Sequence, residues 1–303
     1  QSTALALISC DQTRSKVIHP QVPRYDAIIY CDLGCEPAWV ADQVRFIERA
    51  CVDCNIPFYI LQSNLYQDYM QRFGRQRVSA MPFWTLDEQG KAGRIARRSC
   101  TVDYKVLMIQ KFADMNFWAT GPISGFAQRI PLPVSGNTLR PEDIGTHELH
   151  IGFSSEEAHR SFPSRHAMFQ NRFPLIEMGW ERKDCYAYNL DEWGLDSKAS
   201  ACLICPFHRN YFFHHIKNNF PADYASVVNF DNMLAKWQPM SKIKNRVFLS
   251  RSRKRIIDLL PLIVMTHKPL NTAVTKSGTG SRHLDCLNCT YTVLASCFAC
   301  FAE

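Results

Sequence analysis

The stretch Ala27-Ile28-Ile29-Tyr30-Cys31 decides the fold, because it is a short, continuous apolar run that ends at Asp32. Such runs are typical of a strand that is covered on both faces. Residues 37–50 follow with apolar side chains at mixed spacings of three and four, which indicates a helix, and residues 57–61 form a second apolar run. A strand, a helix and a strand at this spacing predict a βαβ unit and therefore a parallel sheet.

The remaining periodic segments extend this pattern on both sides. Further helices are predicted at residues 2–8, 64–77, 100–115, 180–193, 208–218 and 223–237, and further strands at 148–152 and 172–176. We therefore expect an α/β fold: a Rossmann-like (HUP-type) parallel sheet flanked by helices, with a mostly helical C-terminal part. The expected divisions are an α/β domain at 1–200 with an insertion at 121–146, a helical cysteine-motif region at 201–255, and a poorly defined tail at 256–303.

The composition is that of a globular protein with a sizeable core. The chain has 303 residues, of which 46% are hydrophobic, and a formal net charge of +7, which permits an anionic partner without demanding one. Its 13 cysteines stand at irregular spacings, as in a protein of the reducing cytosol that uses some of them as ligands and buries the others. No apolar run reaches the roughly 18 residues of a spanning helix, and Gln1 opens no signal peptide. We expect a cytoplasmic protein with no membrane partner.

The cysteines suggest a metal centre. Cys202 and Cys205 are spaced C-x-x-C before Pro206, and Cys100 follows two arginines. Three thiolates beside cationic residues suit an anionic iron–sulfur centre. A zinc site with His208 as its fourth ligand, and buried thiols without a function, are the alternatives.

Two further observations concern cysteines. We expect a helix to begin at Cys100, so that its dipole and Lys105 lower the pKa of the Cys100 thiol. The tail contains two more C-x-x-C pairs, Cys286 with Cys289 and Cys297 with Cys300, which could together hold a metal ion. The seven residues between the two pairs are a short gap for a zinc ribbon.

Polar residues follow two of the predicted strands. Residues 32–36 lie where a parallel sheet binds ligands, at the carboxyl end of a strand, and Arg160 lies in a loop after another strand, where it could clamp an anion. A turn before a helix and a surface arginine are the plain alternatives. The basic run at 241–255 can neutralise phosphates or form a solvated charged edge.

Five segments occur in an order that resembles the phosphoadenosine phosphosulfate reductase-like branch of the PP-loop (adenine nucleotide alpha-hydrolase) superfamily, of the type common in phages and bacteria. They are residues 1–3, 32–36, 98–105, 152–160 and 202–205. The resemblance runs from Gln1 to about Arg253. It implies that residues 1–200 bind an adenine nucleotide, with the glycines of the phosphate loop and the first strand of the family upstream of Gln1.

The resemblance also implies site residues and cofactors. The cofactors are a 4Fe–4S cluster and ATP or a sulfonucleotide, with a Mg²⁺ ion as companion. The residues implied are Ser2, Thr3, Asp32, Gly34, Glu36, Gly152 and Glu157 for the nucleotide, Lys105 and Arg160 for catalysis, and Cys100, Cys202 and Cys205 for the cluster. Ser99 departs from the reductases, which carry a second adjacent cysteine there, and the tail lacks their Glu-Cys-Gly segment.

The expected function is ATP-dependent, adenylating sulfur transfer to a nucleic acid or a small acceptor. A sulfurtransferase of this kind needs a sulfur or electron donor protein as its partner. Two alternatives stay open: an oxidoreductase acting on a sulfonucleotide (PAPS or APS), and a truncated, non-catalytic nucleotide-binding protein.

Overall fold

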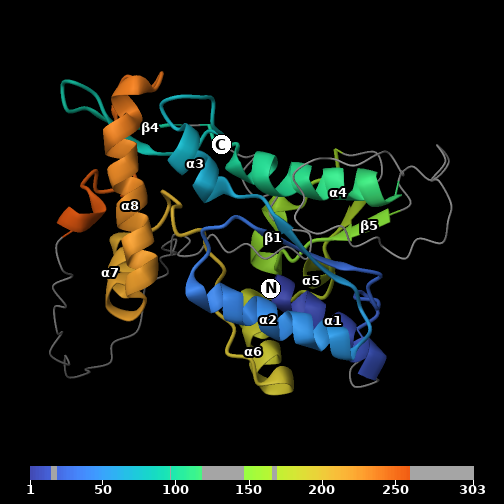
Figure 1. Ribbon diagram of the computed structural model, residues 1–303. Helices are drawn as coiled ribbons and strands as arrows, with labels where there is room; N and C mark the ends of the chain where they lie inside the picture. The colour runs from blue at the N-terminus through green and yellow to red at the C-terminus, as the bar shows by residue number, and fades with distance from the viewer. Residues whose placement is uncertain (15–18, 96, 118–146, 166–168, 260–303) are drawn as a thin grey trace, which may run out of the picture.

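The computed structural model describes residues 1–14, 19–95, 97–117, 147–165 and 169–259, and all structural statements concern these residues (Figure 1). The predicted insertion at 121–146 and the four cysteines of the tail lie outside them. In the described part of the chain, no helix is both long enough and apolar enough to cross a membrane.

The predicted βαβ unit is confirmed. Strand β1 (Ile28–Asp32) pairs in parallel with β2 (Phe58–Gln62), with Ile28 opposite Phe58. Helix α2 (Ala38–Asp53) connects them and begins directly after Pro37. Proline suits this position because a helix start leaves backbone N–H groups without partners, so a missing N–H costs nothing.

A second parallel pair is formed by β5 (His147–His150) and β6 (Phe169–Arg172). The strand predicted at 172–176 is wrong. The strand ends at Arg172, and Pro174 opens the short helix α5 (Pro174–Glu177), where its fixed φ favours the first helical turn. Helix α6 (Arg182–Trp193) follows and ends at Gly194, whose φ of 65° is the left-handed value that glycine tolerates.

The third sheet is antiparallel, with strand order β4-β3-β7. Its strands are three residues each: β3 (Trp84–Leu86), β4 (Ala92–Arg94) and β7 (Arg246–Phe248). Strand β7 comes from the basic run, which was not predicted to form a strand. The described strands therefore give a mixed α/β fold with two small parallel pairs, and a single Rossmann-like sheet stays a proposal.

One core forms around α1 (Ser2–Arg14), which packs against α2 and α6 (Figure 1). The apolar side chains from Ala4 to Ile8 are wholly buried. The amino end of α1 is therefore enclosed by protein rather than lying at the surface.

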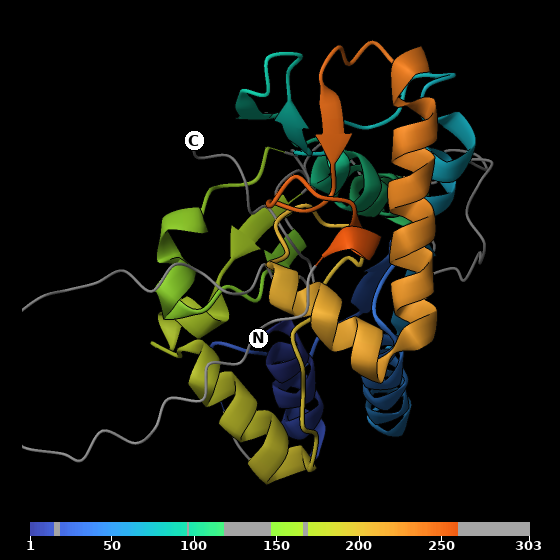
Figure 2. The ribbon, with the colours of Figure 1, turned by 90° about the vertical axis from the view of Figure 1, so that its left-hand side faces the viewer.

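A second core lies between α3 (Leu65–Arg72), α7 (Asn210–Asn219) and α8 (Pro221–Trp237). Figure 2 shows α7 and α8 side by side, with β7 close to them. Helix α3 is shorter than predicted and stops before Gly74. A Cβ on Gly74 would lie 2.5 Å from the carbonyl oxygen of Trp237, so this residue must be glycine for α8 to pack here.

The segment after Cys100 is helical, as predicted, but its first turns are wide. Residues Val102–Val106 form a π-helical turn that continues into α4 (Leu107–Phe117). π-helical turns are rare and frequently found at functional sites. This one carries Lys105 on its inner face, where the side chain is 4% exposed.

Candidate functional site

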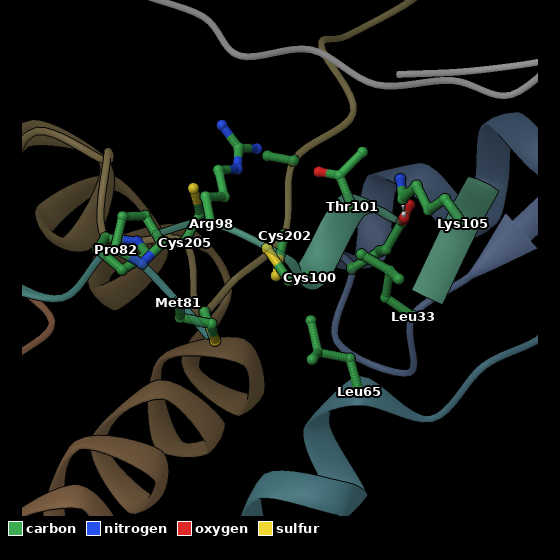
Figure 3. Close-up of a pocket in the computed structure, with 13 residues that line it drawn as sticks. Leu33, Leu65, Met81, Pro82, Arg98, Cys100, Thr101, Lys105, Cys202 and Cys205 are labelled. Carbon is green, nitrogen blue, oxygen red and sulfur yellow. Dashed lines mark ion pairs between the residues drawn. The ribbon is translucent and has the colours of Figure 1, made fainter. Parts of the chain in front are cut away.

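Residues from five separate segments line one pocket with an empty volume of about 530 Å³, open solvent at its mouth included (Figure 3). In Figure 3, Cys100 and Cys202 lie near its centre, with Cys205 and Arg98 on one side and Lys105 on the other. The lining residues are Leu33, Glu36, Leu65, Met81, Pro82, Arg98, Cys100, Thr101, Lys105, Ala201, Cys202, Cys205 and Pro206. Cys100 thus shares one cavity with Cys202 and Cys205, which lie far from it in the sequence.

The C-x-x-C segment is a tight turn fixed by its own backbone. The Cys205 N–H donates to the carbonyl oxygen of Cys202 at 3.0 Å, and His208 Nε2 lies 2.7 Å from the same oxygen. The indole N–H of Trp84 donates to the Pro206 carbonyl at 2.6 Å, which ties the turn to β3. The thiols are therefore presented by a segment that is anchored on both sides.

A fourth thiol, Cys35, reaches the site from the loop between β1 and α2. The Leu203 N–H donates to the Cys35 carbonyl at 2.7 Å, and the two sulfurs of Cys35 and Cys202 are 3.3 Å apart. Sequence reasoning missed this contact. The signal available was a cysteine at the carboxyl end of a predicted strand, within a segment already expected to bind a ligand.

Ser99 holds the backbone and does not line the pocket. Its hydroxyl oxygen accepts the N–H of Ala80 at 2.9 Å and lies 2.9 Å from the Ser79 hydroxyl. The Ser99 N–H in turn donates to the Ala80 carbonyl at 2.9 Å. Ser99 therefore fixes the backbone that approaches Cys100.

The expectation that the Cys100 thiol has a lowered pKa is wrong. Burial raises the pKa of Cys100, and the neighbouring Arg98 offsets this only in part. Arg98 is the cation with the largest effect on this thiol, and Lys105 forms an ion pair with Glu36. Desolvation of the thiolate outweighs the nearby charge and the helix end.

Lys105 and Glu36 form a buried ion pair at the pocket wall. The distance from Lys105 Nζ to Glu36 Oε1 is 3.7 Å, and the two side chains are 4% and 7% exposed. The Tyr30 hydroxyl donates to Glu36 Oε2 at 2.5 Å. Burial raises the pKa of Glu36 to about 7, since desolvation exceeds the opposing effects of Lys105 and Tyr30. A carboxyl group of this kind can gain or lose a proton near neutral pH.

Asp32 and Gly34 shape the loop that brings Cys35 and Glu36 to the pocket. Asp32 Oδ1 accepts the Gly34 N–H at 2.7 Å, and Gly34 has a φ of 69° that favours glycine. Neither residue lines the pocket itself.

The other predicted nucleotide residues gather at the amino end of α1. Ser2 and Thr3 are buried there, and a Cβ on Gly152 would lie 2.5 Å from Ser2 Oγ and 2.7 Å from Ser2 N. The loop after β5 can therefore approach α1 this closely only with glycine at that position. These residues do not line the pocket of the thiols.

Charged side chains complete this second group. The Glu157 carboxylate accepts hydrogen bonds from the side chains of Gln1, at 2.7 Å, and Arg160. Arg182 Nη2 lies 3.8 Å from Glu157 Oε1. Arg160 also stacks 4.4 Å above the ring of Phe153. Two arginines and one carboxylate thus lie beside a helix N-terminus, a position that favours anions.

A third group of cations surrounds Trp84. The guanidinium carbons of Arg94, Arg251 and Arg253 lie 5.8, 5.5 and 5.4 Å from its ring centroid. Arg98 lies 5.2 Å from the ring of Phe207, which follows Pro206. Within the described residues, no carboxylate forms an ion pair with Arg94, Arg251 or Arg253, so this surface keeps its positive charge.

The thiols have the chemistry of iron ligands, but they are not closed around a metal. Among the described side chains, no group of three or more His, Cys, Asp or Glu is arranged to hold a metal ion. His208 is a poor fourth zinc ligand, because its Nε2 faces the Cys202 carbonyl and the ring stacks on Phe212 with centroids 3.5 Å apart. Burial lowers the pKa of His208 to about 4. The roles of Cys100, Cys202 and Cys205 as cluster ligands stay predictions.

Comparisons with known proteins give no relative for this chain. A scan against protein-family models, a search of curated proteins and a search of solved structures each found no match.

Proposed function

We propose that this protein is a phosphoadenosine phosphosulfate reductase-like enzyme that transfers sulfur with ATP. The observation that carries the proposal is the pocket in which Cys100, Cys202 and Cys205 meet the buried Lys105–Glu36 pair. Thiols supply sulfur chemistry, and a carboxyl group that titrates near neutral pH supplies proton transfer. The two parallel strand pairs would belong to one Rossmann-like sheet.

The nucleotide phosphates would bind at the amino end of α1. The backbone N–H groups near Ser2 and Thr3, the close approach of Gly152, and the side chain of Arg160 support this placement. Arg160 would exchange part of its contact with Glu157 for phosphate oxygens and stabilise the charge that develops there. A Mg²⁺ ion would accompany the phosphates, with Asp32 and Glu36 on the nucleotide side.

Cys100, Cys202 and Cys205 would hold a 4Fe–4S cluster, since Arg98 gives this thiol group a cationic neighbour. When bound with one open iron position, such a cluster supplies a place for the sulfur to be transferred. In the reaction, an oxygen of the acceptor attacks ATP and releases pyrophosphate, and the sulfur nucleophile then displaces AMP. Glu36 would take up and return the proton at its carboxyl oxygen, and Lys105 would hold that carboxyl in place.

The acceptor would be a nucleic acid. The arginines around Trp84 support this choice, because guanidinium groups bind phosphates and aromatic rings can stack on bases. The hydrogen bond from Trp84 to the Pro206 carbonyl joins this surface to the cysteine turn.

ATP–pyrophosphate exchange in the presence of bulk cellular RNA as acceptor, together with iron analysis of anaerobically purified protein, tests the proposal. Sulfur transfer predicts both a cluster and exchange activity, and Arg160→Ala should lower exchange at least tenfold while Arg45→Ala, an exposed arginine paired with Asp42, leaves it unchanged. A cluster without exchange would favour the sulfonucleotide reductase. Neither property would favour the non-catalytic nucleotide-binding protein.

A further inference from the structure

We propose that Cys35 and Cys202 form a redox-active dithiol that closes to a disulfide by exchange with small-molecule disulfides. The observation is the 3.3 Å separation of their sulfurs at the edge of the thiol pocket. The disulfide requires neither ATP nor a cluster, so it stands apart from the proposed function.

The two segments are placed for this bond. A disulfide has sulfurs about 2.05 Å apart and Cα atoms about 5.5–6 Å apart. The hydrogen bond from the Leu203 N–H to the Cys35 carbonyl, 2.7 Å long, already holds the two backbones at neighbouring positions. Cys35 and Cys202 both lie in loops, so closing the sulfurs by about 1.3 Å needs side-chain rotation without breaking a helix or strand.

Cys35 is assigned as the partner thiol of Cys202 and not as a fourth ligand, because Cys202 lines the pocket together with Cys100 and Cys205, whereas Cys35 does not line it.

Access distinguishes the thiols of the pocket from the cysteines of the apolar cores. Cys10, Cys31, Cys51 and Cys185 are 0% exposed and lie within the apolar cores. Cys202 is partly exposed and lines the pocket, so a disulfide reagent can reach it. Cys35 lies behind it, 5% exposed.

The exchange proceeds in two balanced steps. The Cys202 thiolate attacks a disulfide RSSR, which forms a mixed disulfide with Cys202 and releases one thiolate RS⁻. The Cys35 thiolate then attacks the sulfur of Cys202, forms the protein disulfide and releases the second RS⁻. The two protein thiols are oxidised and give up two protons, and RSSR is reduced to two thiols.

This bond would also control the metal site, and that consequence rests on the proposed function. A sulfur held in a disulfide is no thiolate ligand. Oxidation would therefore remove Cys202 from the three proposed iron ligands, and reduction would restore it.

The test uses the full chain, free of metal, treated with oxidised glutathione and then alkylated and digested with trypsin without reduction. We expect a linked pair of peptides, residues 25–45 with 199–209, in which fragmentation places the bond between Cys35 and Cys202. Cys35→Ser should abolish the linked pair. The matched control Cys205→Ser removes another thiol of the same pocket and should retain it.

Three results would overturn the assignment. One is a bond between Cys202 and Cys205 inside residues 199–209, which Cys35→Ser would leave intact. Another is a stable mixed disulfide between glutathione and Cys202, with no linked peptide pair, in wild-type protein that keeps its native circular dichroism. The third is a link from residues 199–209 to Cys31. Loss of ATP–pyrophosphate exchange alone would refute the proposed function and leave the disulfide standing.

Discussion

The buried pair of Lys105 and Glu36 makes a prediction about stability and pH. In the folded protein the pKa of Glu36 is raised from its ordinary value of 4.5 to about 7. The folded state therefore binds more protons than the unfolded state between these values, and stability falls as pH rises through that window. At about 1.4 kcal/mol per pKa unit, the fall due to Glu36 amounts to about 3 kcal/mol, and it levels off above about pH 7.

In the Lys105→Met variant, the stability should go on falling to higher pH than in the wild type. Lys105 lowers the pKa of Glu36, so without it this pKa lies above 7. The variant should keep losing about 1.4 kcal/mol per pH unit where the wild type has levelled off. Its destabilisation relative to the wild type should thus be small at about pH 6 and grow above about pH 7, towards the roughly 3–5 kcal/mol that breaking a buried ion pair costs.

Urea unfolding followed by tryptophan fluorescence at about pH 6 and about pH 8.5 measures this difference. Lys111→Met is the matched control, since Lys111 is exposed on α4 and should show no pH-dependent difference. A destabilisation by Lys105→Met that is equal at the two pH values would refute the assigned coupling between Lys105 and Glu36.

Three further variants test other parts of the structure. Gly152→Ala should destabilise the protein by about 1–3 kcal/mol in thermal unfolding, because the new Cβ would clash with the backbone of Ser2. The control Gly93→Ala would clash only with the Thr85 hydroxyl and should cost less. Equal costs for the two variants would contradict the close approach of Gly152 to Ser2. Ser99→Ala should cost about 1 kcal/mol, since the partly buried N–H of Ala80 loses its acceptor, and an unchanged urea midpoint would argue against that bond. Arg94→Glu combined with Arg251→Glu should weaken binding of single-stranded DNA or RNA at least tenfold by fluorescence anisotropy, while the charge-matched pair Arg45→Glu and Arg49→Glu, at exposed positions of α2, should not. Equal effects of the two double variants would assign the binding to net charge alone.

The local part of the fold was predictable from the sequence. The apolar runs around Ile28 and Tyr59 identified two parallel strands, and Pro37 and Gly194 marked a helix start and a helix end. The short strands β4 and β7 were not predictable, because three residues within basic segments carry no periodicity and depend on pairing with β3. The apolar residues at 172–176 indicate a strand, but Pro174 favours a helix start, so the strand ends at Arg172 and α5 begins.

The site was predictable in its residue types and not in its contacts. The cysteines, Lys105 and Glu36 were all named from motifs, and they line one pocket. The contact between Cys35 and Cys202 spans 167 residues, so it depends on tertiary structure alone. The pKa shift of Cys100 was predicted in the wrong direction, because neighbouring charges and a helix start can be read from the sequence whereas the burial of the thiol cannot.

Iron and acid-labile sulfide content after anaerobic reconstitution tests the central claim most directly. The wild-type chain should bind about four iron and four sulfide per protein with the brown colour of a 4Fe–4S cluster, and Cys205→Ser should lose both while keeping its circular dichroism. The control Cys185→Ser changes a wholly buried cysteine outside the pocket and should keep the cluster. Equal iron in the wild type and in Cys205→Ser, or none in either, would contradict the account.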